Sequence, residues 1–281
     1  SLAHLVMTDE RLYRDRHVVD AAQYAVAHGD DPVNGNDFVG TRAFVSQSLL
    51  AQSEAQRTAA LGRPPSILGP TQTDWFLQTL QASGATWKLW GNPLVLNRLW
   101  LDLRNLAPSP YDDVFVLDAD AWDGYPTHKA ALLTGLRQRG VRNLVALTGD
   151  LHAFQCGVVR DQPDPATGVP VLVDFVCAGI SSTSLYGALK AEVGSSPLAN
   201  LVVTPSVLDG AVRRDNPDLV HVDHDAQGYA TITLTATSLV VDFVKVKPLN
   251  ADGTAPASPL AGRTRFTLAS GSLAPVVQLN V

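Results

Sequence analysis

The chain has 281 residues, of which 46% are hydrophobic and 17% are charged, and its formal net charge is −6. This length allows one large domain or two small ones with a sizeable core, and the low charged fraction excludes a wholly disordered chain. The sequence has no basic run for nucleic-acid binding and no apolar stretch long enough for a transmembrane helix. Its two cysteines exclude a disulfide-dense scaffold and a four-thiolate zinc site.

The first third of the chain combines one buried strand with helices. The apolar run at 3–8 predicts a core strand, and a polar loop follows from Asp9. Because the chain opens on a core strand, we expect partner strands from an upstream piece. The Gly, Pro and Asn residues at 28–37 predict a loop. The remaining helices and short strands are predicted, in order, at 43–61, 71–83, 87–90 and 94–96.

The most regular stretch reads strand, loop, helix, strand. Residues 114–117 and 144–148 are the apolar strands, and Pro126 begins a helix that runs to about Arg139. This order predicts a parallel strand pair joined by a right-handed crossover. Polar residues follow both strands, so we expect them to meet at the carboxyl edge of a sheet, where ligand sites assemble.

The last part of the chain is predicted to be mainly antiparallel β-structure. Alternating or apolar segments separated by turns predict these strands, and the fold class is α/β. We expect one domain portion over 1–247 and an extension with short strands over 248–281. The predicted strands are 154–159, 169–176, 229–235, 239–246, 263–268 and 275–281.

Two loops carry residues that suit metal chemistry. Asp150 and His152 come directly after a buried strand, and a carboxylate beside an imidazole suits a mixed metal site. Asp118, Asp120 and Asp123 crowd the other loop, where carboxylates repel one another unless a cation lies between them. The alternatives are a turn-capping Asp with a surface His and a solvated acidic loop.

The motifs in these loops resemble a known family. Trp-Asp-Gly-Tyr-Pro at 122–126, followed by Gly-Asp-Leu-His at 149–152, is similar to the PhoD-type alkaline phosphatases, a family that includes enzymes described as phospholipases D. That family belongs to the calcineurin-like metallophosphoesterases. Supporting matches lie at 9–15, 67–76 and 216–229, and the resemblance covers about residues 2–246. It implies a β-sandwich flanked by helices, of which this chain is the C-terminal portion.

The resemblance also implies a metal site and a reaction. Fe3+ and Ca2+ are the expected metals, with other divalent ions as alternatives. His152 is expected to bind the iron-type metal, and Asp150 and Asp123 the calcium-type metal, with Asp120 as a further candidate ligand. The implied activity is hydrolysis of phosphate monoesters or diesters, including phospholipids, by an exported bacterial protein, either periplasmic or secreted. No catalytic or substrate-binding side chain is assigned. For Arg11 and Arg14 we favour structural ion pairs over phosphate contacts.

Half of the family's metal ligands have no counterpart in this chain. We therefore expect the N-terminal fragment of the same precursor to be a partner and the isolated chain to be inactive. The alternative is a non-catalytic β-rich binding module with a decayed site.

Three other residues have open interpretations. His128, in the first turn of the predicted helix, is expected to face solvent rather than substrate. Cys156 and Cys177 flank a turn, so a disulfide and two buried thiols both fit.

Overall fold

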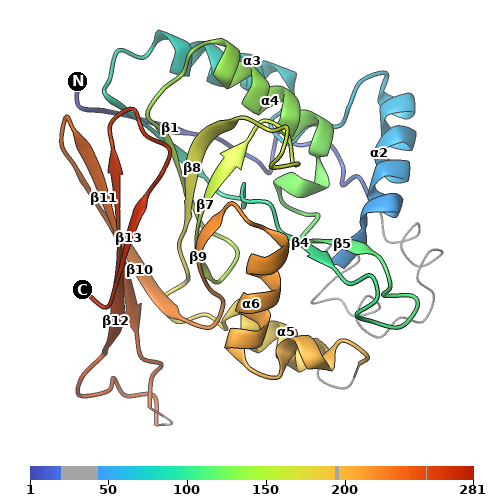
Figure 1. Cartoon of the computed structure of the whole chain (residues 1–281). Helices are drawn as coiled ribbons and strands as arrows, with labels where there is room; N and C mark the ends of the chain where they lie inside the picture. The colour runs from blue at the N-terminus through green and yellow to red at the C-terminus, as the bar shows by residue number, and fades with distance from the viewer. Residues whose placement is uncertain (20–43, 194–195, 251) are drawn as a thin grey trace.

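The computed structural model describes residues 1–19, 44–193, 196–250 and 252–281. The loop predicted at 28–37 lies outside these residues. Two β-sheets pack face to face, and helices cover the outer face of the larger sheet (Figure 1). The expected α/β sandwich flanked by helices is therefore confirmed.

The larger sheet has six strands in the order β1-β3-β6-β8-β7-β9. Its first four strands run parallel to one another, and β7 runs antiparallel to both β8 and β9. The carboxyl ends of β1, β3, β6 and β8 therefore lie on one edge, which we call the carboxyl edge. The strands are β1 (Ala3–Met7), β3 (Trp87–Asn92), β6 (Leu144–Thr148), β8 (Pro170–Val176), β7 (Phe154–Arg160) and β9 (Leu219–Asp223).

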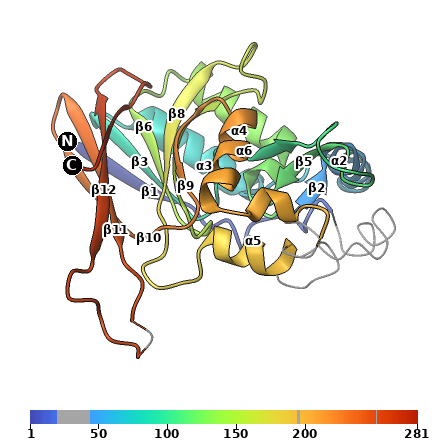
Figure 2. The same ribbon diagram turned by 60° about the horizontal axis from the view of Figure 1, so that its bottom comes forward.

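The second sheet is an antiparallel meander, which lies along one side of the molecule (Figure 2). Its strands are β10 (Gln227–Leu234), β11 (Ser238–Val246), β12 (Leu260–Ala269) and β13 (Val276–Leu279). Buried aromatic rings fill the space between the sheets: the ring of Phe243 lies 4.7 Å from that of Phe154 and 4.8 Å from that of Phe266. The strands expected after residue 248 thus belong to the same sheet as β10 and β11.

The helices pack on the opposite face of the larger sheet. Phe76, Leu80, Leu132 and Leu136 are almost fully buried there, and they come from the two helices predicted at 71–83 and 126–139. Among the described residues, no helix combines the length and apolar character needed to cross a bilayer. The helices are α2 (Gln47–Leu61), α3 (Gly69–Ala82), α4 (Pro126–Gln138), α5 (Leu185–Val193) and α6 (Pro205–Asp215).

The predicted pairing of strands 114–117 and 144–148 is wrong. Residues Val114–Leu117 form β5, which lies in a separate three-stranded sheet with β2 (Phe44–Ser46) and β4 (Trp100–Asp102). β5 pairs antiparallel to both neighbours. The connection from β4 to β5 is short, so local antiparallel pairing closes a smaller loop than a crossover to β6 would. The parallel neighbours of β6 are β3 and β8.

Other departures are local. The helix predicted from 43 begins at Gln47, because Ser46 accepts a hydrogen bond from Leu49 N and caps it. Residues 94–96 are not a strand, since the backbone amide of Leu94 bonds to the buried Glu10 carboxyl and that of Leu96 to Asp174. The elements β4, α5, α6 and β9 were not predicted, and β2 lies where the start of a helix was predicted.

Candidate active site at the carboxyl edge

A chain of buried hydrogen bonds fixes the loop at 118–125 to the larger sheet. The indole of Trp122 donates to Asn92 Oδ1 at 3.0 Å, and Asn92 Nδ2 donates to Thr148 Oγ1 at 2.7 Å. Thr148 in turn donates to Asp174 Oδ1 at 2.6 Å. The loop after β5 is therefore held at the ends of β3 and β6, although β5 belongs to another sheet.

Gly124 closes the same loop. A Cβ atom at this position would lie 1.7 Å from the carbonyl oxygen of Ala119, so a larger residue cannot be accommodated without moving the backbone. The hydroxyl of Tyr125 donates to the carbonyl of Asp15 at 3.1 Å, which ties the loop to the segment after β1. These contacts explain the sequence Trp-Asp-Gly-Tyr in structural terms.

Three carboxylates, those of Asp118, Asp120 and Asp150, interact through their charges in this region. Burial above all, together with the charges of Asp120 and Asp150, raises the pKa of Asp118 to about 7. Burial, then the charge of Asp120, also raises the pKa of Asp150. These charge interactions indicate that the loops after β5 and β6 lie near each other, even though the strands that precede them do not pair.

The backbone is strained at the same place. Asp118, Asp150 and His152 have φ angles of 61°, 70° and 57°, in the left-handed region that residues other than glycine rarely adopt. Such residues cost of the order of 1–3 kcal/mol each and cluster at functional sites.

His152 is oriented by the loop that follows β8. Its Nδ1 lies 2.8 Å from the carbonyl oxygen of Thr183, which can only accept, so Nδ1 carries the proton. In the neutral ring, Nε2 is then an acceptor with its lone pair exposed. A backbone carbonyl that fixes the tautomer in this way is the usual support of a metal-binding imidazole.

Asp120 has ion-pair partners from the segment after β1. Arg14 Nη2 lies 2.7 Å from Asp120 Oδ1, and His17 Nδ1 lies 2.8 Å from the same oxygen. Burial disfavours the charged carboxylate, but these hydrogen bonds and charges outweigh it and hold the pKa of Asp120 below its ordinary value. The structural ion pair expected for Arg14 is confirmed.

Asp123 lies apart from this group. Its Oδ2 accepts from the backbone amide of Leu99 at 2.9 Å, and its Oδ1 accepts from Lys129 Nζ at 2.5 Å. Its side chain lines a different cavity, between α2, α4 and β7. The structure therefore brings Asp118, Asp120 and Asp150 together and gives the carboxylate of Asp123 other partners. The metal-binding role predicted for Asp123 stays a prediction.

The donor set suits hard cations but is incomplete in the described part of the chain. Carboxylates and one imidazole are the ligands that iron and calcium take from proteins. Asp118 joins the candidate metal ligands. It directly follows β5, and this position at the end of a strand is visible in the sequence. Within the described residues, no group of three or more His, Cys, Asp or Glu side chains is close enough together to hold a metal ion.

His128 is buried, not exposed as predicted. Its Nδ1 accepts from the backbone amide of Ile67 at 3.2 Å, and its ring stacks on Trp122 with centroids 5.6 Å apart. Burial lowers its pKa to about 4, so it is neutral at pH 7. Cys156 and Cys177 are free thiols, which settles the alternative left open by the sequence.

Comparison with known proteins identifies the family. A profile of PhoD-like phosphatases matches residues 1–243. The chain belongs to the PhoD-like phosphatase family. It is 22% identical over 200 residues to alkaline phosphatase D of Bacillus subtilis (strain 168), an alignment that covers 71% of this chain and 29% of that protein.

The fold is shared with a solved structure of PhoD. The TM-score is 0.65 at 16% sequence identity, and the match covers 100% of this chain and 42% of that chain. The matched part is thus less than half the length of each of these relatives.

Proposed function

We propose that this chain supplies part of the active site of a metal-dependent phosphoric ester hydrolase. The observation that carries the proposal is the convergence of Asp118 and Asp150 at the carboxyl edge, with Asp120 and His152 on the same two loops. Membership of the PhoD-like phosphatase family supports the reaction class. The substrates proposed are phosphate monoesters and diesters, with phospholipids as a further class.

The metal-binding groups are proposed from these residues. His152 Nε2 suits an iron ion, and the Asp150 and Asp118 carboxylates suit a calcium ion; Asp120, already paired with Arg14, is a further candidate. When bound, such metals polarise phosphoryl oxygens and lower the pKa of a bound water towards 7. The chain's own residues orient the imidazole and hold the carboxylates in place.

The structural ion pair expected for Arg11 is not found among the described residues, and Arg11 is proposed instead to contact the substrate phosphate. In the described part of the chain its guanidinium has no hydrogen bond or ion pair, and its charge acts on Asp150. Its backbone is fixed: Asp9 Oδ1 accepts from the amides of Arg11 and Leu12 at 2.9 and 2.8 Å. Gln72 in turn holds the backbone of Asp9 through two hydrogen bonds of 2.8 and 2.7 Å. A planar cation on a rigid loop suits recognition of a phosphate.

The rest of the site is proposed to come from an N-terminal fragment of the same precursor. β1 forms an edge of the larger sheet, and Leu5 and Met7 on it are 56% and 63% exposed. An exposed apolar edge strand is a template for a further strand. Both relatives are longer than this chain, so they contain additional polypeptide.

Co-expression tests this division. The chain would be purified alone and together with the upstream segment of its gene, and both samples assayed with p-nitrophenyl phosphate and bis-p-nitrophenyl phosphate. We expect turnover only in the combined sample, together with bound iron and calcium. Normal turnover by the chain alone contradicts the two-part site. A metal-free and inactive combined sample contradicts the hydrolase and favours a non-catalytic binding module.

A further inference from the structure

The carbonyl that orients His152 belongs to the connection between β8 and α5, which we call the β8–α5 loop (residues 177–184). His152 Nδ1 lies 2.8 Å from Thr183 O in this loop. A second bond joins the same two segments, since the backbone amide of Leu185, the first residue of α5, donates to His152 O at 3.0 Å. The orientation of the imidazole therefore depends on what holds the β8–α5 loop in place.

Asp225 and Gln227, at the point where β9 turns into β10, hold both neighbours of Thr183. On one side, Gln227 Nε2 donates to the carbonyl of Ser182. On the other side, Ser184 Oγ donates to Asp225 Oδ1 at 2.8 Å. The Thr183 carbonyl is thus fixed from both directions along the chain.

The bond to Asp225 also fixes the start of α5. Ser184 directly precedes this helix, and its Oγ accepts from the backbone amide of Gly187 at 3.0 Å, as the side chain of an N-cap residue does. The hydroxyl therefore accepts from α5 and donates to Asp225, and Asp225 determines which way its proton points. Leu185, whose amide bonds to His152, lies inside this capped turn.

A third contact joins the two segments through their backbones. Gly228 N, in β10, donates to Gly179 O at 3.1 Å. The β8–α5 loop is tightly folded at this end, because a Cβ atom at Gly179 would lie 2.2 Å from Ser182 Oγ. The loop is therefore bound to the start of β10 along most of its length.

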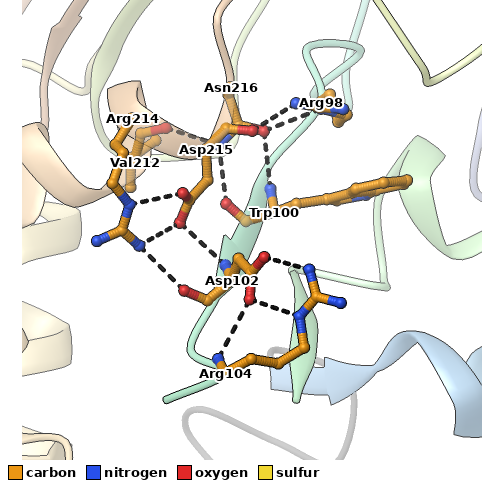
Figure 3. Close-up of polar contacts among 8 residues, drawn as sticks. All are labelled: Arg98, Trp100, Asp102, Arg104, Val212, Arg214, Asp215 and Asn216. Carbon is orange, nitrogen blue, oxygen red and sulfur yellow. Dashed lines mark hydrogen bonds and ion pairs between the residues drawn. The ribbon is translucent and has the colours of Figure 1, made fainter. Parts of the chain in front are cut away.

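The turn that carries Asp225 is itself anchored to α6. Asp209 in α6 accepts from the backbone amide of His224 at 3.2 Å and lies 2.6 Å from His224 Nδ1. Asn216, which directly follows α6, accepts from Trp100 N at 3.0 Å and donates to Trp100 O at 2.8 Å (Figure 3). The turn is thus bound to a helix whose far end is bound to β4.

We propose that Asp225 and Gln227 are positioning residues for the His152 imidazole. They hold the Thr183 carbonyl where it keeps the proton on Nδ1 and leaves Nε2 as the exposed acceptor. The consequence for metal binding rests on the function proposed above, whereas the orientation of the imidazole does not. Loss of an outer contact of this kind typically weakens a metal site by about 10–100-fold.

Three substitutions separate the contacts from the mere presence of the side chains. Q227E keeps the size of the side chain but replaces its amide donor by a carboxylate, which cannot donate to a carbonyl. D225A removes the acceptor of the Ser184 hydroxyl, whereas D225N keeps an oxygen at that place. Q278E on β13 and D74A on α3, both at exposed positions, are the matched controls. Circular dichroism verifies folding of each variant.

The tautomer of His152 is the first readout. It is measured by 15N NMR of histidine-labelled protein, with any polypeptide that co-purifies, after removal of metal with EDTA and at about pH 8, where a neutral ring predominates. H152A assigns the signal. We expect the proton on Nδ1 in the wild type, in D225N and in both controls. In Q227E and D225A we expect a mixture in which a large share of the molecules carries it on Nε2.

Iron retention is the second readout. The chain is co-expressed with the upstream segment of its gene and dialysed against increasing concentrations of EDTA. We expect Q227E and D225A to hold iron about tenfold more weakly than the wild type, and D225N and both controls to behave like the wild type.

The two readouts distinguish a failure of this proposal from a failure of the proposed function. An Nδ1–H tautomer that persists in folded Q227E and folded D225A overturns the positioning role, and so does a change of tautomer that D225N or the controls share. If the tautomer changes as expected but the wild type binds no iron, the positioning role stands and the metal-dependent hydrolase is contradicted.

Discussion

Lys129 Nζ lies 2.5 Å from Asp123 Oδ1, and these side chains are only 12% and 9% exposed. Asp123 belongs to the Trp-Asp-Gly-Tyr motif, and Lys129 lies one and a half turns further along, in α4. Lys129 and the Leu99 amide thus bond to the two oxygens of the carboxylate that the sequence analysis assigned to a metal.

Removal of the lysine is expected to destabilise the fold. K129M leaves the Asp123 carboxylate buried without its cation, which costs about 3–5 kcal/mol. The double variant D123N/K129M removes both charges and is expected to recover most of that loss. Urea unfolding measures the free energy of unfolding of K129M and of D123N/K129M, with R142M at an exposed position as the control. If D123N alone lowered bound metal but not stability, Asp123 would be a ligand after all.

His128 makes stability depend on pH. Its pKa is about 4 in the folded chain and 6.5 in the unfolded chain, because burial disfavours the charged ring. Between these values the unfolded chain binds a proton that the folded chain does not, so stability is lost as pH falls from 6.5 towards 4. The loss from this residue is of the order of 3 kcal/mol.

H128Q removes this titrating group, so a comparison with wild type measures its contribution to the pH dependence of stability. The variant is expected to be less stable at pH 7, because the bonds to Ile67 and Ser66 are lost, but its stability should fall less between pH 6.5 and 4. His221, whose pKa burial also lowers to about 4, contributes equally to both proteins. Parallel pH profiles for wild type and H128Q would contradict the assignment.

Gly124 is expected to tolerate no side chain. G124A places a Cβ 1.7 Å from Ala119 O and must displace the loop that carries Asp118 and Asp120. We expect a lower Tm and a lower metal content. G210A is the matched control, since a Cβ at Gly210 in α6 meets nothing within 4 Å and alanine gains helix propensity of about 1 kcal/mol. Equal Tm values for the two variants would show that the loop is not closed by Gly124.

Arg11 gives the most direct test of phosphate binding. R11A in the combined protein is expected to raise KM for p-nitrophenyl phosphate by about tenfold or more, in line with a lost charged hydrogen bond, and to leave Tm unchanged. R16A, also at an exposed position in the same segment, is the control. An unchanged KM for R11A would leave Arg11 without a role at the site.

The sequence predicted single elements better than their partners. The periodicity of α4 and the apolar run of β6 are local signals, so both are found close to the expected residues. The membership of β5 in a separate sheet depends on contacts with Phe44 and Trp100, which no local pattern encodes.

The candidate site shows the same division. Asp150 and His152 were candidates because they follow a strand directly; both lie just after β6, and their metal role stays a prediction. The pairing of Asp123 with Lys129 could not be predicted, because the three carboxylates of this loop are equivalent in the sequence until the loop is folded. His128 was misplaced for a related reason: its burial is created by the adjacent Ser66 and Ile67 and by Trp122, which belong to two other segments of the chain.

Elemental analysis of the combined protein tests the central proposal most directly. Wild type, H152A and D150N would be compared with H4A, which changes a histidine on β1 that bonds to Ser83 outside the site. We predict that wild type and H4A bind iron and calcium, that H152A loses chiefly iron and that D150N loses chiefly calcium. Metal contents that are the same in all four proteins would contradict the convergence of the two loops on shared cations.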